Sequence, residues 1–177
     1  MSTLVILAHP NMGDSTVNKI FVEELQKESK EEIIIHDLYS LYPDFNIDIA
    51  AEQELLSKAD RIILQAPVYW YNITPLLKKW MDDVFQFGWA FGPEGGRLKN
   101  KSFGLVVTAG GTEEKYIGMK DELPSLGACY IGIYMSLKYL GAKSTPPFLH
   151  FGSTPHSNSI EQATKAAPRY VEYVLTT

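Results

Sequence analysis

The sequence predicts an α/β fold: a doubly wound, open sheet of five parallel strands with helices on both faces. Five short runs rich in Ile, Leu and Val recur along the chain, and each is nearly continuous in hydrophobic residues. This pattern is typical of strands that are buried on both faces of a parallel sheet. Helical patterns fill the segments between the runs, and such alternation indicates a doubly wound sheet. The expected strands are 4–8, 32–36, 61–66, 102–108 and 148–151.

The first helix is predicted from apolar residues at helical spacing. It follows Asp14 and Ser15, and either of these side chains could cap its N-terminus. Its apolar residues are Val17, Ile20, Phe21 and Leu25.

Two later helices carry clearer end signals. In one, Thr74 is the expected N-cap, Pro75 occupies the first helical position, and Gly88 is expected to end the helix. The last helix should begin near Ser157 and be interrupted at Pro168, because proline cannot donate the backbone hydrogen bond that a helix requires.

Length and charge limit the class of protein. The chain has 177 residues and no internal repeat, which predicts a single domain over residues 1–177. Its net charge of -5 argues against a nucleic-acid binder, because such proteins normally carry a basic face.

Cysteine, histidine and hydropathy patterns limit it further. The single cysteine, Cys129, excludes an intramolecular disulfide and fits a reducing cytoplasm. The four histidines have no cysteine partners at ligand spacing, so no metal site is expected. The apolar run 4–8 is too short for a signal peptide, and 123–142 contains Pro124 and Lys138, which favour a buried helix over a membrane span.

Ligands of doubly wound sheets bind beyond the carboxyl ends of the strands, where the strand order reverses. That rule directs attention to the loops at 9–18, 67–74 and 108–116. Each follows a predicted strand, so all three should meet at one edge of the sheet.

The first loop combines polar side chains with the start of a helix. It lacks G-x-G-x-x-G, which disfavours a Rossmann dinucleotide site, and Asp37 is more simply a turn residue than a ribose contact. His9, Ser15, Thr16 and Asn18 surround a helix N-terminus, where free N–H groups and the helix dipole favour an anion. The loop therefore predicts a phosphate site, although Ser15 and Thr16 could simply be caps.

The second loop, PVYWYNITP (67–75), places three aromatic residues after a buried strand. Exposed aromatic side chains are costly without a binding role, and a flat ring system would suit them. Backbone N–H groups of the loop could then bond the edge of that ring. In the alternative interpretation, Trp70 and Tyr71 only cover the core.

The third loop, TAGGTEEKY (108–116), contains adjacent glycines. Gly110 and Gly111 permit close approach of the backbone to a ligand and positive φ angles, although a simple tight turn would explain them too. Tyr116 could donate a hydrogen bond to a substrate or be an ordinary half-buried tyrosine. Phosphate at the first loop and a ring at the other two together predict a flavin nucleotide.

Four segments resemble one family. LAHPNMGDSTVN (7–18), PVYWYNITPLLKKWMDDVF (67–85) and residues 108–111 resemble the flavodoxin-like NAD(P)H:quinone oxidoreductases. LYPDFNIDIAAEQ (41–53) is similar to their short bacterial branch, which includes the ancillary flavoproteins of glutathione-gated potassium-efflux systems. The likeness runs from the first strand to about Phe148.

The resemblance implies a flavodoxin-like fold that binds FMN or FAD. It places phosphate at the first loop, the edge of the isoalloxazine at the second and its other side at the third. FMN is favoured over FAD because the short chain has no obvious segment for an adenine. The implied cofactor-binding residues are His9, Ser15, Thr16, Val17, Asn18, Pro67, Val68, Tyr69, Trp70, Tyr71, Thr108, Ala109, Gly110 and Gly111.

The expected activity is a two-electron, ping-pong transfer from NADH or NADPH through the flavin to a quinone or a similar electrophile. Tyr116 is the candidate catalytic residue. The family's larger members pair this tyrosine with a nearby histidine, and none occurs in the segment IGMKDELPSLG (117–127) that follows it here. A Tyr–His relay is therefore not carried over.

Two other functions are alternatives to this one. The likeness at 41–53 supports a regulatory subunit of a potassium-efflux transporter, which would place a cytoplasmic protein at the inner face of the membrane. A one-electron flavodoxin shuttle is disfavoured because the phosphate loop and strong acidity of flavodoxins are missing.

The resemblance also implies a homodimer with each flavin near the subunit boundary. Residues 123–140 support this expectation, since they are apolar on more sides than one domain needs. The aromatic segment FQFGWAFGPEGG (85–96) could cover the pocket of a partner.

Overall fold

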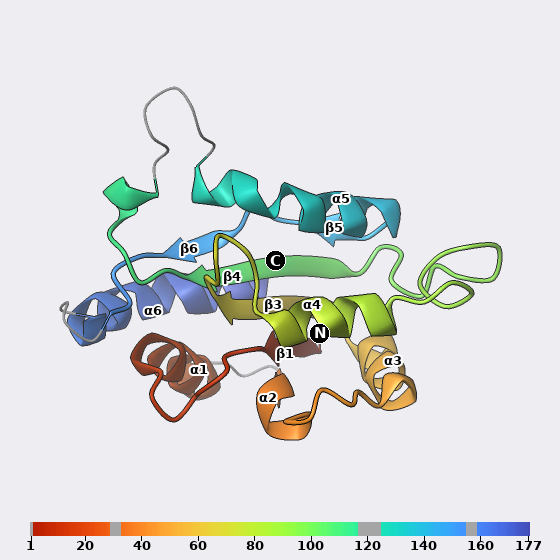
Figure 1. Cartoon of the computed structure of the whole chain (residues 1–177), viewed down its shortest axis with the longest axis horizontal. Helices are drawn as coiled ribbons and strands as arrows, with labels where there is room; N and C mark the ends of the chain where they lie inside the picture. Colours follow the sequence, from red (N-terminus) through yellow and green to blue (C-terminus); the bar gives the residue numbers. More distant parts are fainter. Residues whose placement is uncertain (1, 29–32, 117–124, 155–158) are drawn as a thin grey trace.

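A computed structural model describes residues 2–28, 33–116, 125–154 and 159–177 of the chain. A parallel sheet forms its centre, with the strands in the order β2-β1-β3-β4 and both β5 and β6 paired with β4 (Figure 1). The predicted doubly wound α/β fold is confirmed. The strands are β1 (Thr3–Leu7), β2 (Ile33–Asp37), β3 (Arg61–Pro67), β4 (Ser102–Thr108), β5 (Lys143–Ser144) and β6 (Phe148–His150).

The fifth position of the sheet differs from the prediction. One strand was expected over 148–151, but β5 and β6 share this place as two short parallel segments. Pro146 and Pro147 lie between them. Proline has no N–H to give to a ladder, so the pairing stops and resumes after it.

The strand order creates a switch point at β1. The chain leaves β1 for β2 on one side and returns to β3 on the other. The crevice beyond the carboxyl ends of β1 and β3 is therefore the expected ligand position in an open sheet of this kind.

Helices cover both faces of the sheet. On one face, α1 and α6 lie side by side and pack on Val5, Ile63 and Val106 (Figure 1). Ile62 and Leu64 point to the opposite face, where α4 packs, because side chains alternate along a strand. The helices are α1 (Thr16–Glu28), α2 (Leu38–Leu41), α3 (Ile49–Lys58), α4 (Pro75–Val84), α5 (Ile131–Tyr139) and α6 (Ser159–Thr176), with short 3₁₀ turns η1 (Glu113–Lys115) and η2 (Leu126–Tyr130).

The predicted start of α4 is confirmed, and its predicted end is wrong. Thr74 is the N-cap and Pro75 takes the first position. The helix ends at Val84, before Gly88. Gly88 instead serves the following loop, where its φ is +83° and its N–H donates to the carbonyl of Phe91 at 2.8 Å.

The expected interruption of α6 is also wrong. The helix is continuous from Ser159 to Thr176 with Pro168 inside it, and the predicted start near Ser157 lies outside the described residues. Pro168 and Thr164, whose carbonyl loses its usual partner, are both exposed. Water can therefore solvate that carbonyl, and packing of the opposite face keeps the helix intact.

Residues 126–139 form η2 followed by α5, with Leu126, Tyr130, Ile133 and Leu137 buried. The opposite side of α5 is apolar and exposed. Across the described ranges, no helix combines the length and the apolar character that crossing a membrane demands.

Candidate flavin site at the sheet switch point

The predicted loops meet in a cavity of about 200 Å³ at the carboxyl edge of the sheet, which we call the switch-point cavity. It brings together nine of the predicted residues from three loops. Two further residues, Asp14 and Ser153, complete its wall. The lining residues are His9, Asp14, Ser15, Thr16, Val17, Asn18, Pro67, Val68, Thr108, Gly110 and Ser153.

His9 enters the cavity as a neutral donor. The backbone N–H of Asn11 donates to its Nδ1 at 3.2 Å, which leaves Nε2 to carry the ring hydrogen. Burial lowers the pKa of His9 and outweighs the opposing effects of the Asn11 hydrogen bond and of Asp37. Near neutral pH, this imidazole is uncharged and donates through Nε2.

Helix α1 begins at the cavity. Thr16 is its first residue and follows the buried Ser15. The first N–H groups of a helix have no partner within it, so those of Thr16 and Val17 suit an anion.

The cavity wall has no lysine or arginine among the residues that line it. The nearby Lys19 ammonium donates to the carbonyl of Gly13 at 2.6 Å. The one carboxylate at the wall, Asp14, accepts from the Asn11 side chain at 2.5 Å. An anion in this cavity would therefore be held by neutral donors, whose orientation then decides the affinity.

Asn18 links two hydroxyl groups of the cavity wall through hydrogen bonds. Its Nδ2 donates to Ser15 Oγ at 3.2 Å and to Thr108 Oγ1 at 3.1 Å. Its Oδ1 accepts from Gln65 Nε2 at 3.0 Å. The amide of Asn18 is thus fully used by the protein, so it orients two hydroxyls and is not itself free for a ligand.

Gln65 and Tyr170 extend this network, and sequence reasoning missed both. The Tyr170 hydroxyl donates to Gln65 Oε1 at 2.8 Å, and neither side chain is exposed. A signal for Gln65 existed, since it is a polar residue between the apolar Leu64 and Ala66 of a predicted buried strand. A glutamine buried there needs partners. Nothing local marked Tyr170, which helical spacing assigns to the core.

The aromatic turn, residues 69–72, stands beside the cavity. Tyr69 and Asn72 exchange backbone hydrogen bonds at 2.9 and 3.0 Å. Trp70 and Tyr71 between them have φ of +49° and +58°, which is the pattern of a type I′ turn. That turn normally uses Asn and Gly, so two aromatic residues there are strained and point to a function.

The alternative that Trp70 only covers the core is wrong, because its side chain is 95% exposed. The hydrogen bonds of the turn also reduce the number of backbone N–H groups that could bind the edge of a ring. The N–H groups of Val68 and Tyr69 already donate to Thr108 and Asn72, and Pro67 has none. Of residues 67–71, only Trp70 and Tyr71 keep N–H groups for the edge of a ring.

The two glycines of the third loop provide space, and neither of them has a positive φ angle. A Cβ on Gly111 would lie 2.9 Å from the ring of Tyr116, and one on Gly110 would lie 3.2 Å from Thr154. Gly111 N–H donates to the Tyr116 hydroxyl at 3.4 Å. The Tyr116 ring also contacts Tyr71, with centroids 5.9 Å apart.

Ser153 was missed by sequence reasoning. Its Oγ is buried and has no hydrogen-bond partner among the described residues, although it lines the cavity. The residue follows β6, and the loop after the fifth parallel strand must reach the same edge as the others. That topological rule could have indicated it.

Asp37 lies in a turn, as the sequence favoured over a contact with a ribose. Its carboxylate caps α2 and accepts from the N–H groups of Tyr39 and Ser40 at 3.1 and 3.3 Å.

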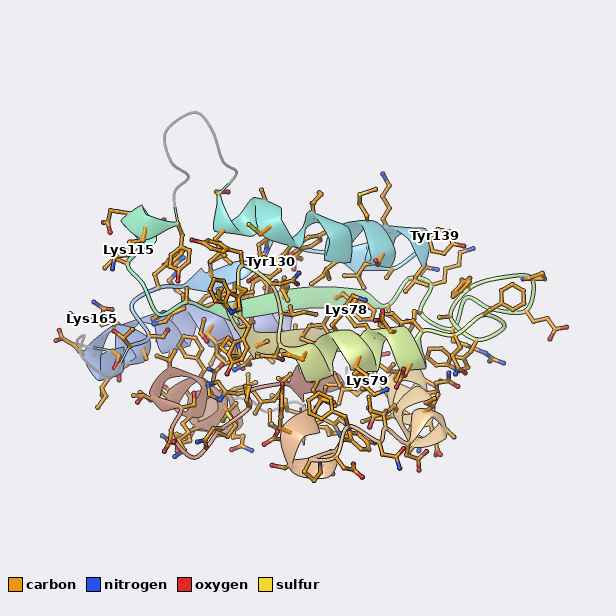
Figure 2. The ribbon with its side chains drawn as sticks, viewed as in Figure 1. Lys78, Lys79, Lys115, Tyr130, Tyr139 and Lys165 are labelled. Atoms are coloured by element: carbon orange, nitrogen blue, oxygen red, sulfur yellow. The ribbon has the colours of Figure 1, made fainter. Side chains whose placement is uncertain are left out.

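A second, larger hollow of about 430 Å³ lies between α4 and α5, away from the switch-point cavity. Lys78 of α4 and Tyr139 of α5 are among its lining residues (Figure 2). Ile131, Met135 and Tyr139 expose apolar surface on α5, and Phe87 does so on the adjoining loop.

A sequence model for proteins with the flavodoxin-like fold matches residues 1–174. The chain belongs to this flavodoxin-like family. One family member, the uncharacterized NAD(P)H oxidoreductase YrkL of Bacillus subtilis (strain 168), is 37% identical over 174 residues, which cover 98% of each chain. The ancillary protein KefF of the glutathione-regulated potassium-efflux system of Klebsiella aerogenes is 44% identical over 146 residues, or 82% of this chain and 80% of KefF.

Solved structures of this flavodoxin-like family agree with the fold. General stress protein 14 of Treponema denticola, determined in complex with FMN, has a TM-score of 0.89 and 33% identity, with 99% of each chain covered. An NADPH-quinone reductase from P. pentosaceus has a TM-score of 0.81 and 26% identity over 98% of each chain.

Proposed function

We propose that residues 1–177 form one FMN-binding domain that acts as an NAD(P)H oxidoreductase and reduces quinones or similar electrophiles. The observation that carries this proposal is the switch-point cavity. It contains uncharged hydrogen-bond donors suited to a phosphate and lies beside a strained, exposed aromatic turn. Family membership and the FMN complex of the Treponema denticola relative support the same cofactor.

The residues at the cavity fit a flavin phosphate. His9 Nε2, the hydroxyls of Ser15 and Thr16 and the start of α1 supply donors, and the unpartnered Ser153 hydroxyl offers one more. Pro67, Val68, Tyr69, Trp70 and Tyr71 would line one edge of the ring and Ala109, Gly110 and Gly111 its other side, with Thr108 between the ring and the phosphate.

When bound, the flavin supplies hydride acceptance and two-electron donation. The protein's own part is to position the reactants. Trp70 and Tyr71 offer N–H groups at the ring edge and exposed aromatic surface for a planar acceptor. The Tyr116 oxygen accepts from Gly111, so its hydroxyl proton is left to donate to a bound acceptor.

The first test is the visible spectrum of the purified protein, with the released chromophore identified by mass. We expect FMN, bleached by NADH or NADPH in the absence of oxygen. A colourless protein that neither FMN nor FAD reconstitutes would overturn the proposal.

Ping-pong exchange is tested by initial rates. Because one pocket serves both substrates in turn, double-reciprocal plots at several acceptor concentrations should be parallel. Intersecting lines would show a ternary complex and contradict this part of the proposal.

We also propose a homodimer formed through the hollow between α4 and α5. Exposed apolar side chains around it, including Met135, Tyr139 and Phe87, favour a covered surface. Met135→Lys should shift the mass measured by light scattering from dimer to monomer, whereas Gln26→Lys on α1, which covers the other face of the sheet, should not. A monomeric wild-type protein would contradict it.

A second candidate function is that of a cytoplasmic ancillary subunit of a potassium-efflux transporter, which similarity to KefF supports. The likeness at 41–53 adds little, because its buried residues serve the fold. Ile47 is in the core, and Tyr42 donates to the buried Glu52. Co-purification with such a transporter, with an unrelated membrane protein as control, would test it.

A further inference from the structure

A chain of buried hydrogen bonds runs from the last helix to the switch-point cavity. It passes from Tyr170 on α6 to Gln65 on β3, then to Asn18 on α1, and ends at Ser15 and Thr108. We call Tyr170, Gln65 and Asn18 the amide chain. We propose that Gln65 and Tyr170 are positioning residues that fix the direction of this chain, so that the hydroxyls of Ser15 and Thr108 donate to the ligand phosphate. This inference rests on the proposed function.

The direction begins at Tyr170. Its hydroxyl is 0% exposed, and burial raises its pKa, so the phenol keeps its proton. In the described part of the chain, its partner is Gln65 Oε1 at 2.8 Å. A buried hydroxyl must place its proton on an acceptor, and here the acceptor is the glutamine oxygen.

That contact orients both amides. With Oε1 engaged by Tyr170, the Gln65 amide turns its Nε2 to Asn18 Oδ1 at 3.0 Å. Asn18 must then direct both Nδ2 hydrogens outward, one to Ser15 and one to Thr108. If the chain ran in the opposite direction, the Tyr170 proton would have no acceptor.

The direction of the hydrogen bonds in the amide chain decides whether the cavity offers donors or acceptors to a ligand. The hydroxyl oxygens of Ser15 and Thr108 accept hydrogen bonds from Asn18. Each hydroxyl therefore donates its single proton to a group other than Asn18. Both residues line the cavity, whose wall offers an anion no lysine or arginine side chain. In such a wall, two hydroxyls fixed as donors bind phosphate. The same hydroxyls turned inward would present oxygen lone pairs to it.

The decisive variant is Gln65→Glu. The introduced carboxylate only accepts, so it takes hydrogen bonds from Tyr170 and from the Asn18 amide, which must flip. Asn18 Oδ1 then faces Ser15 and Thr108, and their protons turn inward. We expect the Kd of FMN at pH 8 to rise by about 10- to 100-fold, as for loss of charge-assisted hydrogen bonds. Riboflavin, which lacks phosphate, should change by less than about threefold.

The pH profile separates this role from a merely structural one. At pH 5.5 a buried carboxyl regains its proton, can donate to Asn18 Oδ1 and should restore much of the affinity for FMN. Gln65→Met should lose affinity by the same factor at both pH values. Other ionisable groups near the cavity are His9, Asp14, the FMN phosphate and His150, which lies on β6 opposite Thr108. Wild-type protein is therefore measured at each pH, and the affinities are compared as ratios.

A second pair covers the case in which Gln65→Glu does not fold. Tyr170→Phe removes the donor that sets the direction and should raise the Kd of FMN about threefold to tenfold, again with little effect on riboflavin. The matched control is Tyr173→Phe on the same helix, whose hydroxyl contacts Pro146 and Leu105 instead. It should leave both affinities unchanged.

Flavin fluorescence gives these affinities without any measurement of turnover. If wild-type protein binds no FMN, the proposed function fails and this inference fails with it. If wild-type protein binds FMN and Tyr170→Phe matches Tyr173→Phe, only the inference is overturned. Equal losses for FMN and riboflavin would likewise overturn it, because the chain would then not act at the phosphate.

Discussion

Two buried polar networks lie on opposite faces of the sheet and differ in charge. Beneath α3 and α4, Glu52 is 1% exposed and accepts from His36, Tyr42 and Trp80 at 2.7, 2.5 and 2.7 Å. Burial alone would raise the pKa of Glu52, but these three hydrogen bonds outweigh it and hold the pKa below its ordinary value. We call this group the carboxylate cluster. The amide chain on the other face carries no charge.

The two networks also differ in whether they reach the switch-point cavity. The carboxylate cluster is closed: its donors all converge on one carboxylate and none reaches the switch-point cavity. The amide chain is open, because it ends at the hydroxyls of Ser15 and Thr108, which line that cavity. A closed network stabilises the fold, whereas an open one transmits hydrogen-bond direction to a site. The two should therefore respond differently to mutation.

The largest effect is expected for Glu52→Ala. It leaves the buried Trp80 and the half-buried His36 and Tyr42 without their acceptor and should lower the free energy of unfolding by about 3–5 kcal/mol, measured by urea denaturation. Glu54→Ala on the same helix, where the carboxylate is exposed and pairs with Lys58, is the control and should cause no measurable change. Similar effects of the two variants would erase the distinction between the networks.

The aromatic turn should show the opposite balance, with affinity lost and stability gained. Trp70→Gly removes exposed aromatic surface and relieves a left-handed backbone, so the free energy of unfolding should rise by about 1 kcal/mol. The Kd of FMN should rise by about threefold to tenfold.

Trp70→Ala separates the two effects. Alanine retains the left-handed strain, so this variant should lose FMN affinity to the same extent without the gain in stability. If Trp70→Ala retained its full flavin content, the role of this turn in binding would be contradicted.

The smallest effect concerns pH. Burial lowers the pKa of His150, so the unfolded chain binds this proton more readily than the folded one. Stability is then complete above the unfolded pKa of about 6.5 and is lost as pH falls below it toward the lowered folded pKa. His150→Phe, in aromatic surroundings beside Phe21, should flatten the decline of apo-protein stability between pH 7 and 5. If the stability of the variant fell with pH as steeply as that of the wild type, His150 would be excluded as a cause of the decline.

Local pattern predicted most of the fold. Continuous apolar runs located four strands to within a residue or two, and Thr74-Pro75 located the start of α4. The errors, at β5 and β6, at the end of α4 and at Pro168, share one cause. Each depends on how the surrounding chain packs, and short-range signals do not contain that information.

The candidate site divides in the same way. By itself, the sequence determined the fold family, the three loops and nine of the residues at the cavity, because strand ends and motifs are contiguous in the chain. Only the tertiary structure decided that the Asn18 amide is hydrogen-bonded within the protein, that Trp70 is exposed to solvent, and that Gln65 and Tyr170 lie behind the switch-point cavity. Gln65 and Tyr170 are separated by 105 residues, and Asn18 and Thr108 by 90. The direction of a hydrogen-bond chain exists only once such distant partners are brought within 3 Å or so of one another.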